Sequence, residues 1–382
     1  MDLQAAYDDV RQASVDMCTL LEIEDYIPQA AFFASPPKWN LAHTSWFWET
    51  MILKPFLPDY REYHPDYGFL FNSYYIAAGP RFRRHQRGDI SRPTVKEVYA
   101  YRRYVNDHMH TLLEQSSLSE EIQKLIILGI NHEQQHQELF FTDLKYTFSM
   151  NPLFPAYSDK AFCETPVRGN GWVQMSAGLY EIGYRDDGFC FDNELAPHQV
   201  YLHDYEISKN LVTNGEFLEF LNDGGYEKHA LWHDEGWTWR NQNQIEHPMY
   251  WLLKQDGWYQ YTLAGLRPLQ PEDALTHVSY YEAAAFALWK GLRLPTEFEW
   301  EAAADQLKWG SRWEWTESAY LPYPGFKAPA GAVGEYNGKF MVNQKVLRGA
   351  SVATSPGHSR KTYRNFFHPN LGWQFNGIRL AK

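Results

Sequence analysis

The chain has 382 residues, a length that predicts two domains. Hydrophobic residues make up 44% and aromatic residues 17%, a composition that excludes a disordered protein. Its formal net charge of −12 at pH 7 opposes general affinity for a nucleic-acid backbone, so we expect no nucleic-acid partner. The acidic first ten residues and the short apolar runs predict a cytoplasmic chain with neither a signal peptide nor a membrane span.

Cysteine usage agrees with that compartment. The three cysteines are widely spaced and odd in number, and none has the CxxC spacing of a zinc or redox motif. We therefore expect Cys18, Cys163 and Cys190 to be reduced thiols.

The first 150 residues carry helical periodicity, with apolar residues recurring every three to four positions. Four helices are predicted, at 3–21, 39–53, 95–113 and 119–148. Ser119 followed by Glu120 and Glu121 is typical of a helix start. The irregular stretch 55–93 interrupts the pattern, and a loop of that length in a compact bundle is usually functional.

The texture changes after Asn151, where several prolines mark a linker. Short strand-like pieces at 173–175 and 179–183 then alternate with Gly-rich turns, and helical pieces are expected at 213–221 and 281–292. We therefore predict an α+β protein with a helical domain at 1–155 and a second domain at 156–382.

Two histidines in the fourth predicted helix have the spacing of metal ligands. His132 and His136 are four residues apart, so both project from one face about one turn apart. His43 lies among aromatic residues in the second predicted helix, and neighbouring helices of a bundle would bring all three imidazoles together. A buried histidine also commonly just bonds to a carbonyl, so His43 alone is a weak signal.

The same segment supports a competing interpretation. His132, Glu133 and His136 spell H-E-x-x-H, the zinc-hydrolase helix in which the glutamate is the general base. The residues after His136 lack the H-x-x-G-x-x-H continuation of the metzincins, but other classes of zinc enzyme remain possible interpretations. Three imidazoles without a carboxylate leave open positions on a metal, and zinc cannot reduce O2, so the metal decides the reaction class.

Five motifs in order closely resemble the ergothioneine-biosynthesis sulfoxide synthases over nearly the whole chain. They are NLAHTSWFWE, FNSYYIAAGPRFRRHQRG, HEQQHQEL, the pair LPTEFEWE and VLRGAS, and RNFF with WQFNGIRLA. The resemblance implies a DinB-like four-helix bundle followed by a C-type-lectin-like domain of the formylglycine-generating-enzyme type. It also implies iron(II) held by His43, His132 and His136.

The resemblance further implies the substrates: hercynine, which is N-alpha-trimethylhistidine, a cysteine-type thiol, and O2. Binding thiolate and imidazole at adjacent positions on iron would hold sulfur near the ring carbon and remove an entropic barrier. Residues matching the hercynine contacts are Gln135 and Asn365, with Phe366 and Phe367 as aromatic faces for a quaternary ammonium.

Two further pairs are implied by the same resemblance. Arg84 and Arg87 match positions that grip the carboxylate of the thiol, a role that guanidinium forks suit, although an exposed basic loop is the simpler alternative. Tyr74 and Tyr75 match active-site tyrosines that can donate a proton, although two aromatic residues packing a loop onto a bundle are common.

The endings of the motifs favour one branch of that family. Relatives that use gamma-glutamylcysteine carry Trp-Asp where this chain has Phe366 and Phe367, so we expect free cysteine as the thiol. Ovothiol synthases and selenoneine synthases share the architecture and remain alternatives, as does a zinc-dependent hydrolase or thiol transferase. Formylglycine-generating activity is not expected, because no cysteine follows Cys190.

Overall fold

The computed structural model describes residues 2–115, 117–160, 162, 166–167, 169–329, 334 and 336–382. The chain divides into two compact units. The first is Met1–Leu153 with Pro329–Tyr336 and Thr354–His358, and the second is Phe154–Ala328 with Asn337–Ala353 and Ser359–Lys382. Cys18 and Cys190 are free thiols, whereas Cys163 lies outside the described residues.

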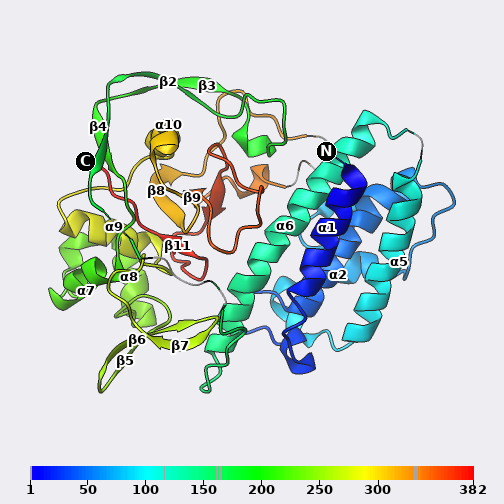
Figure 1. Cartoon of the computed structure of the whole chain (residues 1–382), viewed down its shortest axis with the longest axis horizontal. Helices are drawn as coiled ribbons and strands as arrows, with labels where there is room; N and C mark the ends of the chain where they lie inside the picture. The colour runs from blue at the N-terminus through cyan, green and yellow to red at the C-terminus, as the bar shows by residue number, and fades with distance from the viewer. Residues whose placement is uncertain are drawn as a thin grey trace. The chain divides into compact units, whose positions relative to one another are not determined.

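Four long helices build the described part of the first unit and lie side by side in Figure 1. They are α1 (Leu3–Asp16), α2 (Pro37–Trp48), α5 (Val95–Leu113) and α6 (Glu120–Ser149). Helix α2 packs against α5 and α6, and α1 packs against α6. The predicted helical half is therefore confirmed, with all four helices close to their expected positions.

The helix ends follow from local chemistry. Helix α6 begins where the Ser119 hydroxyl accepts a hydrogen bond from the backbone N–H of Ile122 at 3.3 Å, as the sequence predicts. Helix α1 was expected to reach residue 21 but ends at Asp16. Beyond it the backbone N–H groups of Cys18 and Thr19 bond to carbonyls three residues earlier, which tightens the chain into turns.

Helix α2 is the centre of the first unit, because every residue from Pro37 to Trp48 is buried. Beyond Trp48 it continues through a π-helical turn, η2 (Glu49–Leu53), into the short helix α3 (Lys54–Phe56). A fully buried helix with polar side chains must satisfy them internally, since unpartnered buried polar groups are costly. The histidine on this helix is therefore surrounded by protein on every side.

The irregular stretch before α5 is built from short turns rather than long elements. They are α4 (Tyr67–Leu70), η3 (Ile76–Ala78) and η4 (Arg84–Asp89), and η1 (Ile23–Tyr26) precedes α2. The loop predicted from sequence thus carries the tyrosine pair at the start of η3 and both arginines within η4.

The second unit contains small sheets. The largest has the strand order β10-β9-β8-β11, a second has the order β5-β6-β7, and two pairs are β1-β4 and β2-β3. The strands are β1 (Trp172–Met175), β2 (Gly178–Ile182), β3 (His198–Leu202), β4 (Tyr205–Ser208), β5 (Trp251–Lys254), β6 (Gly257–Thr262), β7 (Gly265–Pro268), β8 (Trp313–Ala319), β9 (Lys345–Gly349), β10 (Asn365–Phe367) and β11 (Asn376–Gly377).

Short helices accompany these strands. They are α7 (Asn214–Asn222), α8 (Asp234–Asn243), α9 (Tyr280–Trp289) and α10 (Glu297–Ala303), with turns η5 (Asp192–Glu194), η6 (His229–Leu231), η7 (Ala304–Gln306) and η9 (Gly338–Phe340). Helices α7, α9 and α10 each begin with a capping box. A Ser or Thr hydroxyl accepts a hydrogen bond from the third backbone N–H of the helix, and the Glu at that third position accepts one from the backbone N–H of the Ser or Thr. The predicted α+β class is confirmed.

Buried ion pairs hold the second unit together beside its aromatic core. Arg379 donates two hydrogen bonds to Glu314, and Arg364 donates two to Glu297, with all four side chains almost fully buried. In the described part of the chain, no helix combines the length and the apolar character that a membrane span requires.

Candidate metal centre

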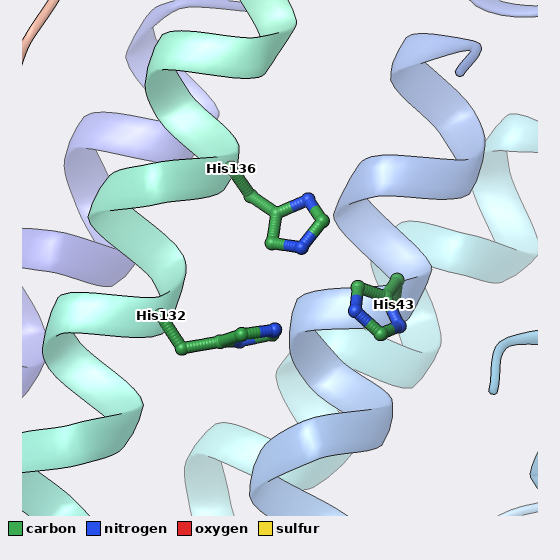
Figure 2. A group of neighbouring side chains, drawn as sticks. All are labelled: His43, His132 and His136. Carbon is green, nitrogen blue, oxygen red and sulfur yellow. The ribbon is translucent and has the colours of Figure 1, made fainter. Parts of the chain in front are cut away.

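Helices α2 and α6 bring three histidines together. Figure 2 shows His132 and His136 projecting from α6 toward His43 on α2. One nitrogen from each ring lies within 4.8 Å of the others, and the ring centroids are 4.6 to 5.1 Å apart. Among the described residues no Asp, Glu or Cys joins this group. The arrangement matches a metal site with three imidazole ligands, a donor set that leaves further coordination positions unfilled.

Neighbouring oxygen atoms fix how two of the rings can bind. His43 Nδ1 lies 2.6 Å from the carbonyl oxygen of Phe71, and His136 Nδ1 lies 3.0 Å from the side-chain oxygen of Asn40. Both oxygens accept, so each Nδ1 carries the proton and each Nε2 keeps its lone pair. Such partners orient metal-binding histidines in known sites.

Three buried ring nitrogens of His43 and His132 are without a protein partner among the described residues. His43 Nε2 and both ring nitrogens of His132 have no hydrogen-bond partner in the part of the chain that the structure describes. Unsatisfied buried polar atoms are costly and call for an explanation such as an ion. A metal bound by lone pairs of all three rings fits these residues.

The same burial keeps the rings neutral. Desolvation, reinforced by His132, places the pKa of His43 well below its usual range, and desolvation lowers the pKa of His132 to about 3. Desolvation followed by His43 and His132 lowers the pKa of His136 as well. Neutral imidazole is the form that ligates metal ions, so the site is ready to bind at neutral pH.

Aromatic rings pack on the histidines. The His43 ring stacks on Trp39, at 4.6 Å between centroids, and on Trp46, at 5.4 Å. These positions are four residues before and three after His43, so they share its helix face. Phe47 stacks on His132 at 4.2 Å. The rings hold the imidazoles in place and exclude water from their sides.

The glutamate of the H-E-x-x-H pattern is engaged elsewhere. Glu133 is fully buried, and its two oxygens accept hydrogen bonds of 2.7 to 3.0 Å from Arg11, Ser14, Trp48 and Arg102. Burial alone would raise the pKa of Glu133, but Arg11 and Arg102 outweigh it and bring the pKa to about 2. All its acceptor positions are filled, so this carboxylate has no capacity to act as a general base on a metal-bound ligand.

The two arginines of η4 differ in environment. Arg87 is 3% exposed, and its guanidinium lies 3.2 Å from the centroid of the Trp39 ring while donating to the hydroxyls of Ser35 and Ser73. No carboxylate pairs with it in the described residues, and burial followed by Arg84 lowers its pKa well below the usual range. The carboxylate of Asp143 acts on the guanidinium from a distance but forms no ion pair with it among the described residues, so an anionic ligand would gain a direct partner. Arg84 is exposed and donates to the Phe33 carbonyl at 2.7 Å.

Gln29 holds the turn that carries these arginines. Its amide nitrogen donates to the carbonyls of Ala34 and Arg84, both at 2.8 Å, and its oxygen accepts from the backbone N–H of Gly88 at 2.9 Å. A Cβ on Gly88 would come within 2.8 Å of the Gln29 Cβ. The single side chain thus bridges both ends of η4, a contact that no local sequence pattern indicated.

Three tyrosines gather near the histidines. The rings of Tyr74 and Tyr75 stack at 4.6 Å with their hydroxyls 3.5 Å apart, and Tyr75 is fully buried. Tyr336, which sequence reasoning missed, lies 6.0 Å from the His132 ring and 6.2 Å from Tyr74. Its only sequence signal was aromatic identity, since about 200 residues separate it from α6.

Segments from late in the chain form hydrogen bonds with α6 beside His132 and His136. Tyr336 donates to the side-chain oxygen of Gln135. His358 contacts the Gln134 oxygen at 3.1 Å, and Ser355 donates to Gln137 at 2.6 Å. The Gln135 side chain therefore faces a neighbour within the same unit.

The remaining predicted substrate residues belong to the second unit. Asn365, Phe366 and Phe367 form β10, which pairs with β9. Phe366 stacks on Tyr320 at 4.0 Å between centroids, and Phe367 meets Trp373 edge-on at 5.2 Å. Within this unit they form an aromatic strand whose rings are half-buried.

Comparisons with known proteins found one domain family and several similar sequences. The family described as Sulfatase-modifying factor enzyme 1-like domain matches residues 159–312. A hercynine oxygenase of Mycolicibacterium smegmatis is 28% identical over 306 residues, covering 66% of this chain and 70% of that protein. A hercynine oxygenase of Mycobacterium tuberculosis is 29% identical over 301 residues, with the same coverage. A formylglycine-generating enzyme of Thermomonospora curvata is 31% identical over 163 residues, covering 37% of this chain and 52% of that enzyme.

These similarities confirm the expected resemblance. The chain is similar to hercynine oxygenases along two thirds of its length, and its second half contains the sulfatase-modifying-factor type of domain.

Proposed function

We propose that the chain is an iron(II)-dependent oxygenase that joins the sulfur of cysteine to an imidazole carbon of hercynine, giving hercynylcysteine sulfoxide. Relatives named hercynine oxygenases support the imidazole substrate. The observation that carries the proposal is the trio of neutral imidazoles His43, His132 and His136. Among the described residues no carboxylate joins the trio, and buried nitrogens of His43 and His132 have no protein partner. Bound there, iron would supply the capacity to bind and reduce O2, which zinc lacks.

The chain's own residues support distinct roles. Phe71 and Asn40 hold the ligand tautomers, and the stacked indoles exclude water from the histidine faces. Arg87 offers a buried cation for the carboxylate of the thiol substrate, positioned by the hydroxyls of Ser35 and Ser73. Binding this anion would satisfy the guanidinium and orient the sulfur, which lowers the entropic barrier to bond formation.

The tyrosines supply protons. Tyr75 is buried beside Tyr74 with their hydroxyls 3.5 Å apart, so a proton lost by one phenol can be replaced from the other. Gln135 is proposed to contact hercynine. The proposal for Asn365, Phe366 and Phe367 rests on the family resemblance alone, and aromatic faces such as theirs suit a quaternary ammonium. Such a group has no N–H to donate, so aromatic faces and carbonyl oxygens are its natural partners.

Free cysteine is the proposed thiol because the chain has Phe366 and Phe367 where users of gamma-glutamylcysteine carry Trp-Asp. Strand β10 consists of Asn365, Phe366 and Phe367, so it offers no charged side chain to a glutamyl arm. The reaction is proposed to take place in the cytoplasm, with small molecules as the partners. Ovothiol and selenoneine synthases are the related alternatives, differing in the ring carbon attacked or in the chalcogen donor.

A zinc hydrolase is the rival from a different class, and the surroundings of Glu133 count against it. The general base of that class must reach a metal-bound water, whereas this carboxylate is bonded to two arginines, an indole and a hydroxyl. Glu133 therefore does not supply the base of that class, and the identity of the bound metal decides between redox and hydrolytic chemistry.

One experiment separates these functions. Protein purified without O2 is analysed for metal, then given hercynine, cysteine and O2 while O2 uptake and products are followed by electrode and mass spectrometry. We expect iron at one per chain and a product with the mass of hercynylcysteine sulfoxide. Tightly bound zinc with no O2 uptake would refute the proposal, and product only with gamma-glutamylcysteine would refute the choice of thiol.

A further inference from the structure

The indole of Trp46 is buried with an N–H group unsatisfied by any described residue, which destabilises the fold. The side chain is fully buried, and its Nε1–H has no hydrogen-bond partner in the described residues. Buried indoles usually find an acceptor, and leaving a buried donor unsatisfied is destabilising. A phenylalanine would fill most of the same space without that cost, so the electronic properties of the indole are the remaining reason for it.

Trp46 begins a path of rings that leads away from the histidines. Its ring stacks on His43 at 5.4 Å, and the next ring, Tyr75, is 5.5 Å away. Tyr75 stacks on Tyr74 at 4.6 Å, and their hydroxyls are 3.5 Å apart. Tyr75 is fully buried whereas Tyr74 is only partly buried, so the path runs from a metal ligand toward solvent.

The second indole on His43 is a poorer electron donor. The Arg87 guanidinium lies 3.2 Å from the centroid of the Trp39 ring, and a positive charge on the ring face makes removal of an electron unfavourable. Trp39 also donates its N–H to the Leu70 carbonyl at 3.2 Å. Trp46 has neither feature among the described residues, so an oxidising equivalent reaching His43 draws its electron from Trp46.

We propose that Trp46, Tyr75 and Tyr74 form an electron relay that protects the ligand histidines when an oxidant forms at the metal without productive turnover. The relay rests on the proposed function, since that oxidant comes from O2 reduction at the metal. One electron passes from Trp46 to the oxidant, and Tyr75 then reduces Trp46 and releases its phenolic proton. Tyr74 restores Tyr75 by giving it an electron and a proton.

A thiol closes the cycle. It gives a hydrogen atom to the Tyr74 radical, and two sulfur radicals combine into a disulfide. Two passages through the relay therefore take two electrons and two protons from two thiols, and the oxidant gains the same two electrons and two protons. Cysteine, the proposed substrate, is a thiol of the required class, so the relay needs no additional reductant.

The test compares Trp46→Phe with Trp46→Tyr, because both rings fill similar space and only tyrosine is readily oxidised. Iron-loaded protein is exposed to O2 and cysteine without hercynine, and peptide masses and retained iron are followed over time. In the wild type, where cysteine restores Tyr74, we expect intact histidines and slow loss of iron. In Trp46→Phe we expect oxidation to move to His43, His132 or His136 and iron loss to become several-fold faster, and Trp46→Tyr should restore the wild-type pattern.

Hydrogen peroxide keeps this test independent of the proposed reaction. Peroxide generates an oxidant at bound iron without O2 uptake or hercynine, so failed product formation would refute the proposed function while the modification pattern still tests the relay. Identical damage and iron loss in the wild type and Trp46→Phe would overturn the relay. So would a Trp46→Phe defect restricted to the Michaelis constant of a substrate, since the indole N–H would then be a binding group.

Discussion

The side-chain oxygen of Asn40 lies 3.0 Å from Nδ1 of His136, so it decides which nitrogen of that ring carries the proton. Asn40→Leu removes the acceptor, and loss of such a partner typically lowers metal affinity by about 10- to 100-fold. Asn40→Asp keeps an acceptor and should retain most of the affinity. Competition against a chelator measures this, and unchanged affinity in Asn40→Leu would show that the bond does not orient the ring.

Removing a ligand should remove the metal. His132→Ala or His136→Ala leaves two imidazoles, too few to hold iron(II) tightly, so we expect the purified variants to lack iron by elemental analysis. His64→Ala, at an exposed histidine of the same unit, is the control and should keep iron. Iron retained at wild-type level in both ligand variants would contradict the three-histidine assignment.

Arg87→Ala should affect the thiol selectively. Bonds to its carboxylate are made in the ground state and transition state alike, so the Michaelis constant for cysteine rises more than turnover falls. A charge-assisted hydrogen bond contributes about 1.5 to 3 kcal/mol, which corresponds to a loss of about 10- to 100-fold in cysteine use. Arg83→Ala, at an exposed neighbour, should change little. A defect restricted to hercynine would place the thiol pocket elsewhere.

Gln29→Leu should reproduce part of that defect without touching an arginine. The substitution removes the bridge from Gln29 to the Arg84 carbonyl and the Gly88 N–H, so η4 loses its anchor. We expect a higher Michaelis constant for cysteine with little change for hercynine. Gln12→Leu, at an exposed glutamine of α1, is the matched control. Equal effects on both substrates would indicate general destabilisation instead.

Glu133→Gln should act on stability. Neutralising this side chain leaves Arg11 and Arg102 buried without their counter-charge, and breaking a buried pair costs about 3 to 5 kcal/mol. Chemical denaturation should show this loss in metal-free protein. Normal stability with turnover abolished and iron retained would instead support Glu133 as a catalytic base and revive the hydrolase interpretation.

Glu299→Gln provides a comparison in the second unit with a defined pH dependence. Burial would raise the pKa of Glu299, but hydrogen bonds from Arg293 and from the Thr296 N–H lower it below the ordinary value of 4.5. A lowered folded-state pKa contributes stability that is complete above the unfolded pKa and is lost as pH falls through the folded one. The deficit of Glu299→Gln should be full at neutral pH and shrink below about pH 4.3. A deficit that is constant with pH would mean that the charge is irrelevant.

The sequence alone determined those parts of the protein that depend on neighbours along the chain. Helical periodicity located α5 and α6, and Ser119 located the start of α6, because hydrophobic spacing and end caps act within a few residues. The four-residue spacing of His132 and His136 placed two candidate ligands on one face for the same reason. The motif resemblance supplied His43 as the third.

Only the tertiary structure decided what surrounds those ligands, because those contacts join residues far apart in sequence. Glu133 follows a ligand directly, yet partners on other helices commit it to structure. Arg84 and Arg87 look alike in sequence, but packing on Trp39 buries only the second. Tyr336 reaches α6 from about 200 residues away. Burial and long-range hydrogen bonds set the protonation and charge of such groups, and no local pattern carries that information.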